Sequence, residues 1–277
     1  LSLINSWRKL LFPLPSSIRN SPVLTSIFAS DQLVISELYL DSIKKPYESI
    51  EAFMGNRVHE VLDWVIKERS NKFTTFDNLT EKYDDLWSRA WHNDILIPDP
   101  RITVDHIYTI GKRCLGNFCT NLGPIFKTNF YATELKLEFK IENYKFRGVI
   151  DRVDKTKEGN WIITDYKTSK REKNTKNAMF DIQLGLYHIA IKDNFKEAEN
   201  ILTGWNFLRP NKEVYIEHTE QSIQKIKNKV LKNIKKIEKN IDEGFLFSPK
   251  ESVLCHWCFY WDECSAKNIL NPALPVR

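Results

Sequence analysis

The sequence has no long apolar run and little glycine. A membrane helix needs roughly 20 consecutive apolar residues, and no segment approaches that length. Only 9 of the 277 residues are glycine and 11 are proline, which excludes collagen-like and low-complexity chains. A glycine-rich phosphate-binding loop and the apolar core of an N-terminal signal peptide are also absent from the sequence. We therefore expect a cytoplasmic protein that has no membrane partner.

Cysteine is scarce, and the number of cysteines is odd. Five cysteines in a chain of this length do not indicate a disulfide framework, so metal binding or simple burial is the better interpretation. The formal net charge of +5 is compatible with a polyanionic partner but does not require one. A content of 42% hydrophobic and 28% charged residues is typical of a folded globular chain.

Hydrophobic periodicity predicts an alternation of helices and strands. Before the first clear pattern we expect an irregular segment with a short helix at about 32–40. Helical spacing of apolar residues predicts helices at about 49–69, 77–93, 102–121 and 177–192, and in the last long segment before residue 243. Alternating residues predict a three-stranded meander within 134–168 and strands at about 200–208 and 213–218. This order predicts an α/β fold whose mixed sheet is flanked by helices.

An acidic and a basic residue end one of the predicted strands. Strand alternation places Asp165 and Lys167 on the same face, about 7 Å apart. Asp151 ends the preceding strand, and a hairpin between the two strands would bring the carboxylates together. Two carboxylates with open positions between them suit Mg²⁺ or Mn²⁺, which can polarise a phosphodiester. A surface ion pair between Asp165 and Lys167 is the alternative interpretation.

Four motifs, taken in order, resemble a known nuclease family. They are Gly55-Asn-Arg-Val-His59, Gly148-Val-Ile-Asp151-Arg-Val-Asp154, Asp165-Tyr-Lys167-Thr168 and Gln183-Leu-Gly-Leu-Tyr187. Together they resemble the RecB-like branch of the PD-(D/E)xK nuclease superfamily, over roughly residues 59–264. The resemblance implies a restriction-endonuclease-like α/β core and metal-dependent hydrolysis of DNA.

The resemblance also implies a role for each residue that matches a motif. Asp151 and Asp165 match the metal-binding carboxylates, and His59 matches a metal ligand on a helix. Lys167 matches the catalytic lysine, and the backbone carbonyl of Tyr166 would complete the metal shell. The implied cofactor is Mg²⁺ or Mn²⁺. Without the other motifs, His59 would be interpreted as a partly buried histidine at the edge of an apolar stripe.

Further residues are expected to contact DNA or to support the site. Gln183 and Tyr187 match a motif that in relatives lies beside the active site and contacts DNA. Four residues apart on a helix, they share one face, and a polar pair beside the core is the alternative. Lys170 and Arg171 follow the catalytic lysine closely, and we expect them to contact the DNA backbone. Glu134, on the first strand of the meander, is expected to have a supporting role.

Three cysteines near the C-terminus have the spacing of metal ligands. Cys255, Cys258 and Cys264 form a C-x2-C-x5-C pattern, and the first two can chelate one metal. Iron–sulphur members of the branch, such as the AddB helicase-nuclease subunit and the CRISPR-associated adaptation exonuclease, add a cysteine from a Cys-Pro pair. This chain has Lys45-Pro46 at that position. We favour a [4Fe–4S] cluster. A zinc site completed by His256, or reduced cysteines packed among aromatic residues, are the other interpretations.

We expect three parts along the chain and one activity. The parts are an irregular segment 1–48, a nuclease core 49–247 with a helical insertion at about 72–125, and a cysteine segment 248–277 packed on the core. The expected activity is that of an exonuclease on DNA ends or single strands in repair, recombination or CRISPR adaptation, with a helicase or CRISPR adaptation proteins as candidate partners. The alternatives are a catalytically silent DNA-binding or scaffolding subunit with a structural zinc, and a restriction-type endonuclease.

Overall fold

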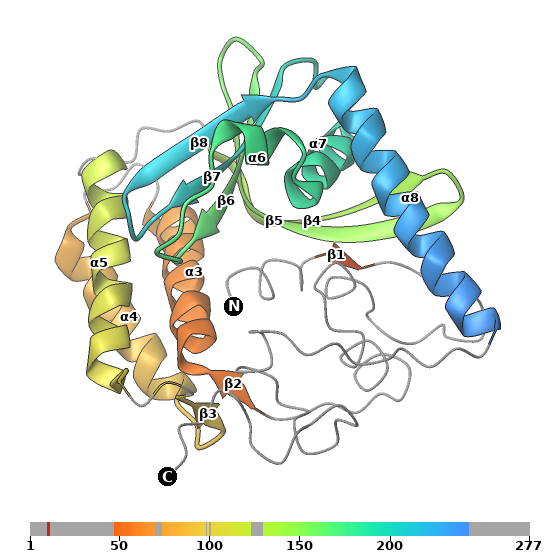
Figure 1. Cartoon of the computed structure of the whole chain (residues 1–277). Helices are drawn as coiled ribbons and strands as arrows, with labels where there is room; N and C mark the ends of the chain where they lie inside the picture. Colours follow the sequence, from red (N-terminus) through yellow and green to blue (C-terminus); the bar gives the residue numbers. More distant parts are fainter. Residues whose placement is uncertain are drawn as a thin grey trace.

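A mixed β-sheet lies between two groups of helices in the computed structural model of the chain (Figure 1). The structure describes residues 10–11, 47–69, 74–97, 99, 101–122 and 130–243. The predicted α/β class with a mixed sheet flanked by helices is confirmed. The predicted helix at 32–40 and the cysteine segment 248–277 lie outside the described residues, so the predicted division into three parts stays a prediction.

The sheet is built around the predicted meander. Its strands are β1 (Leu10–Leu11), β4 (Phe130–Ile141), β5 (Tyr144–Lys155), β6 (Trp161–Lys167), β7 (Ile201–Phe207) and β8 (Lys212–Glu217). They are ordered β1-β5-β6-β7-β8, and β4 also pairs with β5. The pair β6–β7 is parallel and the other pairs are antiparallel. The carboxyl ends of β6 and β7 therefore lie together at one edge of the sheet.

The first group of helices packs against that edge. It comprises α3 (Ile50–Arg69), α4 (Phe76–Ala90) and α5 (Val104–Leu122), together with the short parallel pair of β2 (Glu48–Ser49) and β3 (Ile95–Leu96). Thr75 starts α4 with a capping box, since Thr75 and Asn78 each accept a hydrogen bond from the backbone N–H of the other. The buried apolar faces of the three helices form one cluster that includes Tyr166 and Leu208 from the sheet.

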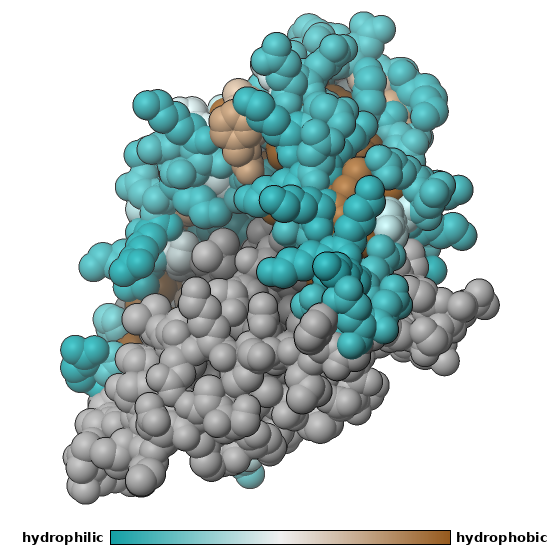
Figure 2. Space-filling view, turned by 45° about the vertical axis from the view of Figure 1, so that its right-hand side comes forward, coloured by the Kyte–Doolittle hydropathy of each residue, from teal (hydrophilic) through white to brown (hydrophobic). Residues whose placement is uncertain are grey.

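The second group of helices packs on the opposite side of the sheet from the first group (Figure 1). It comprises α6 (Thr175–Met179), α7 (Ile182–Asn194) and α8 (Glu220–Asp242). The predicted stripe of α8 is buried at Ile226, Val230, Ile234 and Ile237, while most of its lysines are exposed. In the view turned toward this side of the molecule, the described surface is largely hydrophilic (Figure 2). Helix α8 thus buries one apolar face, as its period of 3.6 residues requires.

One prediction about the helices is wrong. The expected continuous helix at 177–192 is two helices, because the Asp181 carboxylate caps α7 by accepting hydrogen bonds from the N–H groups of Gln183 (3.0 Å) and Leu184 (3.3 Å). Within the segment expected to be irregular, Leu10–Leu11 pairs with β5. None of the described helices is long and apolar enough to cross a bilayer.

Two histidines lie where α7 meets the start of α8: His218 is buried and His188 is half-buried. The rings of His188 and His218 lie 5.5 Å apart in an edge-to-face arrangement. Burial lowers the pKa of each from 6.5 to about 4. The charges of Lys192 and Lys227 lower the pKa of His188 further, and His188 has the same effect on His218. Both rings are therefore neutral in the folded protein near neutral pH.

Stability should fall as the pH is lowered from about 6.5 to about 4. In this window the unfolded chain binds protons that the folded chain does not, which costs up to about 3 kcal/mol of unfolding free energy per histidine. We expect a His188→Gln/His218→Gln variant to show a shallower pH dependence in urea unfolding. His106→Gln, which changes an exposed histidine of α5, is the control. Equal slopes for the wild type and the double variant would contradict the prediction.

Candidate active site

Three carboxylates come from neighbouring positions on three adjacent strands. In the register of β4 and β5, Glu134 lies opposite Asp151. The last pair of β5 and β6 joins Arg152 to Thr164, so Asp151 and Asp165 are the next residues of these strands. Opposed residues of neighbouring strands share a face of the sheet. The sheet therefore brings the acidic side chains into one row.

A histidine from α3 joins two of these carboxylates. One potential ligand atom each of His59, Glu134 and Asp151 lies within 4.8 Å of the other two. His59 Nδ1 is 3.5 Å from Asp151 Oδ2. Glu134 has a φ of 45°, a conformation that is costly for a residue with a side chain and that is typical of functional sites. One imidazole and two carboxylates are a donor set that suits Mg²⁺ or Mn²⁺.

The third carboxylate, Asp165, lies against Lys167. Asp165 is 1% exposed, and its Oδ2 is 2.5 Å from Lys167 Nζ. The Lys167 ammonium is the polar partner of this oxygen among the described residues. A buried carboxylate is costly unless its charge is balanced. A divalent cation beside Asp165 would add to the balance that the lysine supplies.

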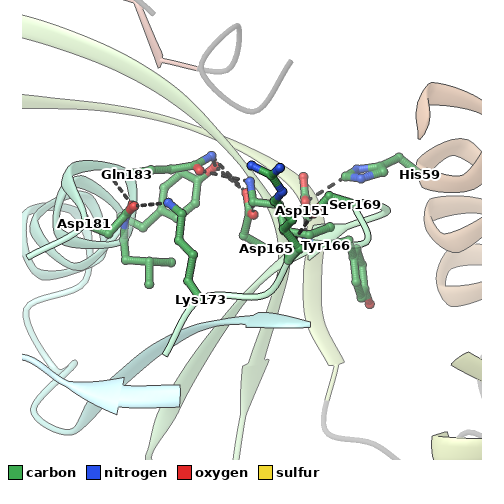
Figure 3. A network of polar contacts seen from close by, with 12 residues as sticks. His59, Asp151, Asp165, Tyr166, Ser169, Lys173, Asp181 and Gln183 are labelled. Atoms are coloured by element: carbon green, nitrogen blue, oxygen red, sulfur yellow. Dashed lines mark hydrogen bonds and ion pairs between the residues drawn. The ribbon is translucent and has the colours of Figure 1, made fainter. Parts of the chain in front are cut away.

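Gln183 connects the polar side chains around Asp165 (Figure 3). Its Oε1 accepts a hydrogen bond from Lys167 Nζ at 3.2 Å. Its Nε2 donates to Asp165 Oδ1 at 2.9 Å and to the Tyr187 hydroxyl at 2.8 Å. Burial, followed by the charge of Asp165, raises the pKa of Tyr187 well above its usual range. The phenol therefore stays protonated and donates to Asp165 Oδ1 at 3.4 Å.

The backbone of β6 holds Asp151 and helps to place His59. The N–H of Tyr166 donates to Asp151 Oδ2 at 2.8 Å. The ring of Tyr166 lies on the side of the sheet that packs against α3, and its centroid is 6.0 Å from that of the His59 ring. Helix α3 approaches the end of β6 closely, since a Cβ added to Gly55 would lie 3.3 Å from Thr168 Oγ1. A side chain at position 55 would therefore require the Thr168 hydroxyl to move by a few tenths of an ångström.

The structure brings most of the predicted site residues together. His59, Asp151, Asp165 and Lys167 lie at the same end of the sheet, and Glu134, expected only to support the site, belongs to the group of possible metal ligands. The roles of individual residues, including that of the Tyr166 carbonyl, stay predictions.

The residues predicted to contact DNA differ in their exposure. Gln183 and Tyr187 do share one helix face, but they are 2% and 0% exposed. Lys170 and Arg171 are exposed on the loop that follows β6. Their contacts with DNA stay predictions, and Cys255, Cys258 and Cys264 lie outside the described residues.

Comparison with known proteins identifies the family. No curated protein matches the sequence. The chain is similar to the crystal structure of a putative exonuclease from Eubacterium rectale (13% identity, TM-score 0.48, covering 91% of this chain and 88% of the other). It is also similar to SSO0001 (15% identity, TM-score 0.34, covering 86% and 95%). The model of the PD-(D/E)XK nuclease superfamily matches residues 37–265, and the chain therefore belongs to this superfamily.

Proposed function

We propose that the protein is a metal-dependent deoxyribonuclease that shortens DNA from its ends or degrades single strands. The observation that carries the proposal is the row of Glu134, Asp151 and Asp165 beside His59 and Lys167. We further propose that it belongs to the RecB-like iron–sulphur branch and acts with a helicase or with CRISPR adaptation proteins, in repair, recombination or spacer acquisition. The motifs of the sequence support this narrower assignment.

The donor set fits a divalent cation. His59, Glu134 and Asp151 would hold Mg²⁺ or Mn²⁺, and Asp165, which lies next to Asp151 in the row of acidic residues, would add a further carboxylate. Such an ion supplies Lewis-acid polarisation of the phosphodiester and a lower pKa of a bound water.

Lys167 is the residue that can act directly on the reacting groups. Its ammonium is held between Asp165 Oδ2 and Gln183 Oε1, which leaves one of its three N–H groups for the attacking water or a phosphate oxygen. Water attacks phosphorus in line with the bond to the 3′ oxygen, that bond breaks, and the leaving oxygen takes up a proton. Asp165 and Gln183 thus set the direction in which the lysine donates.

The first test is a time course on DNA labelled separately at its 5′ and 3′ ends, both single- and double-stranded. We expect progressive shortening with Mg²⁺ or Mn²⁺ and none with EDTA. For Asp165→Ala we expect the cleavage rate to fall by about a thousandfold or more. Binding without cleavage under either metal would support the catalytically silent scaffolding subunit instead. Discrete fragments would support a restriction-type endonuclease.

Replacing Glu134 tests its place among the metal ligands. We expect Glu134→Gln to weaken Mn²⁺ binding in the absence of DNA by about tenfold or more, measured by calorimetric titration, because one anionic donor is lost. Glu138→Gln is the control, since Glu138 lies on the same strand but is exposed and paired with Arg147. Unchanged Mn²⁺ affinity in Glu134→Gln would remove Glu134 from the ligand set.

Replacing Gln183 separates a positioning role from a contact with DNA. We expect Gln183→Ala to lower kcat about 10- to 100-fold with little change in KM, because the buried amide orients Lys167 and Asp165. Tyr187→Phe should have a smaller effect, since it removes the donation to Asp165 and the acceptor for Gln183 Nε2 but leaves the contacts of Gln183 with Lys167 and Asp165 in place. A raised KM with unchanged kcat would indicate the contact with DNA that the sequence motif suggests.

A further inference from the structure

The described arginines differ in whether they have an acidic partner. Most form an ion pair with a carboxylate: Arg57, Arg89, Arg101, Arg147 and Arg152. Arg113, Arg171 and Arg209 form none with any described residue. Arg171 lies on the loop after β6 and Arg209 on the turn after β7. Because β6 and β7 are parallel, both of these segments leave the sheet at the same edge.

Arg209 is anchored next to the catalytic lysine. The N–H of Leu208 donates to the carbonyl of Lys167 at 2.9 Å, and Arg209 is the next residue. Arg209 Nε is buried and has no hydrogen-bond partner among the described residues. Leaving a buried guanidinium N–H without an acceptor is costly. The side chain as a whole is half-buried, and its Nη groups, which are not among the buried atoms, are open to an acceptor that a ligand brings.

Arg113 is held beside Arg209 by the contact between α5 and the turn after β7. Asn117 Nδ2 donates to the carbonyls of Leu208 (2.7 Å) and Arg209 (3.4 Å). Arg113 lies one helical turn before Asn117 and thus on the same face of α5. Burial, followed by the charge of Arg113, lowers the pKa of Arg209. Two like charges are thus kept close together on fixed backbone, an arrangement that an anion would stabilise.

We propose that Arg113 and Arg209 form a binding site for a phosphate of the DNA backbone, beside the site of cleavage. This inference rests on the proposed function, since it requires DNA as the ligand. A guanidinium group presents its donors in a plane that matches the oxygens of a phosphate. A phosphate here would accept from the Nη groups of Arg209, which are not among the buried atoms, and would offset the repulsion between Arg209 and Arg113.

The test is the salt dependence of DNA binding in EDTA, followed by fluorescence anisotropy of a labelled duplex. We expect Arg113→Gln/Arg209→Gln to lower the slope of log K against log salt concentration by about 0.9 for each lost contact. The matched control, Arg89→Gln/Arg147→Gln, removes two exposed arginines that pair with Asp85 and Glu138, and it should keep the wild-type slope. The variant Arg113→Lys/Arg209→Lys retains both charges, so its slope should stay close to that of the wild type.

The outcomes separate this inference from the proposed function. If the wild type binds and cleaves DNA while the glutamine double variant keeps the wild-type slope, the phosphate site is overturned and the nuclease assignment stands. If the wild type neither binds DNA nor cleaves it with Mg²⁺ or Mn²⁺, both are overturned. Should the double variant unfold, Arg113→Gln alone gives the test, because Arg113 is exposed. Its slope should fall by about 0.9, and an unchanged slope would again overturn the site.

Discussion

The site depends on the burial of a carboxylate beside an ammonium group at the end of β6. Asp165 and Lys167 are 1% and 6% exposed, and charges removed from water need partners of good geometry. Gln183 supplies them, since its amide accepts from one group and donates to the other. That contact requires α7 to begin where it does, at the cap formed by Asp181. The Asp181 carboxylate also pairs with Lys173 at 2.9 Å, and this ion pair ties the loop after β6 to the start of α7.

Strand alternation gives the two faces of β5 and β6 different tasks. Asp151 and Asp165 face the site, whereas the residues that follow them, Arg152 and Tyr166, face the opposite side of the sheet. There the Arg152 guanidinium forms a buried pair with Asp154 at 2.7 and 3.1 Å. Tyr166 contributes to both faces, because its N–H binds Asp151 and its ring lies against His59. A shift in register of one residue would therefore turn Asp151 and Asp165 away from the site and turn Arg152 and Tyr166 toward it.

Much of the site could be predicted from the sequence, because strand register follows from local turns. The two-residue turn at Glu142-Asn143 pairs Ile141 with Tyr144, and counting back along both strands places Glu134 opposite Asp151. The same count could have placed Glu134 among the possible metal ligands. No pattern in the sequence indicates the left-handed backbone conformation of Glu134. The break before α7 was hidden by continuous apolar residues on both sides of Asp181. The pairing of Arg113 with Arg209 depends on a tertiary contact between distant segments, which local patterns do not report.

The helices expected to be an insertion pack together with the helix that carries His59. The end of the Tyr83 ring on α4 occupies the space that a side chain at Gly111 of α5 would need. Their buried residues form one cluster with α3 and with Tyr166 of β6. The unit that carries His59 on α3 therefore also carries Arg113 on α5, and it is fixed to the sheet by the Asn117 contacts with Leu208 and Arg209. Because a close-packed interior transmits strain, a displacement of α5 would shift His59 and the proposed phosphate contact together.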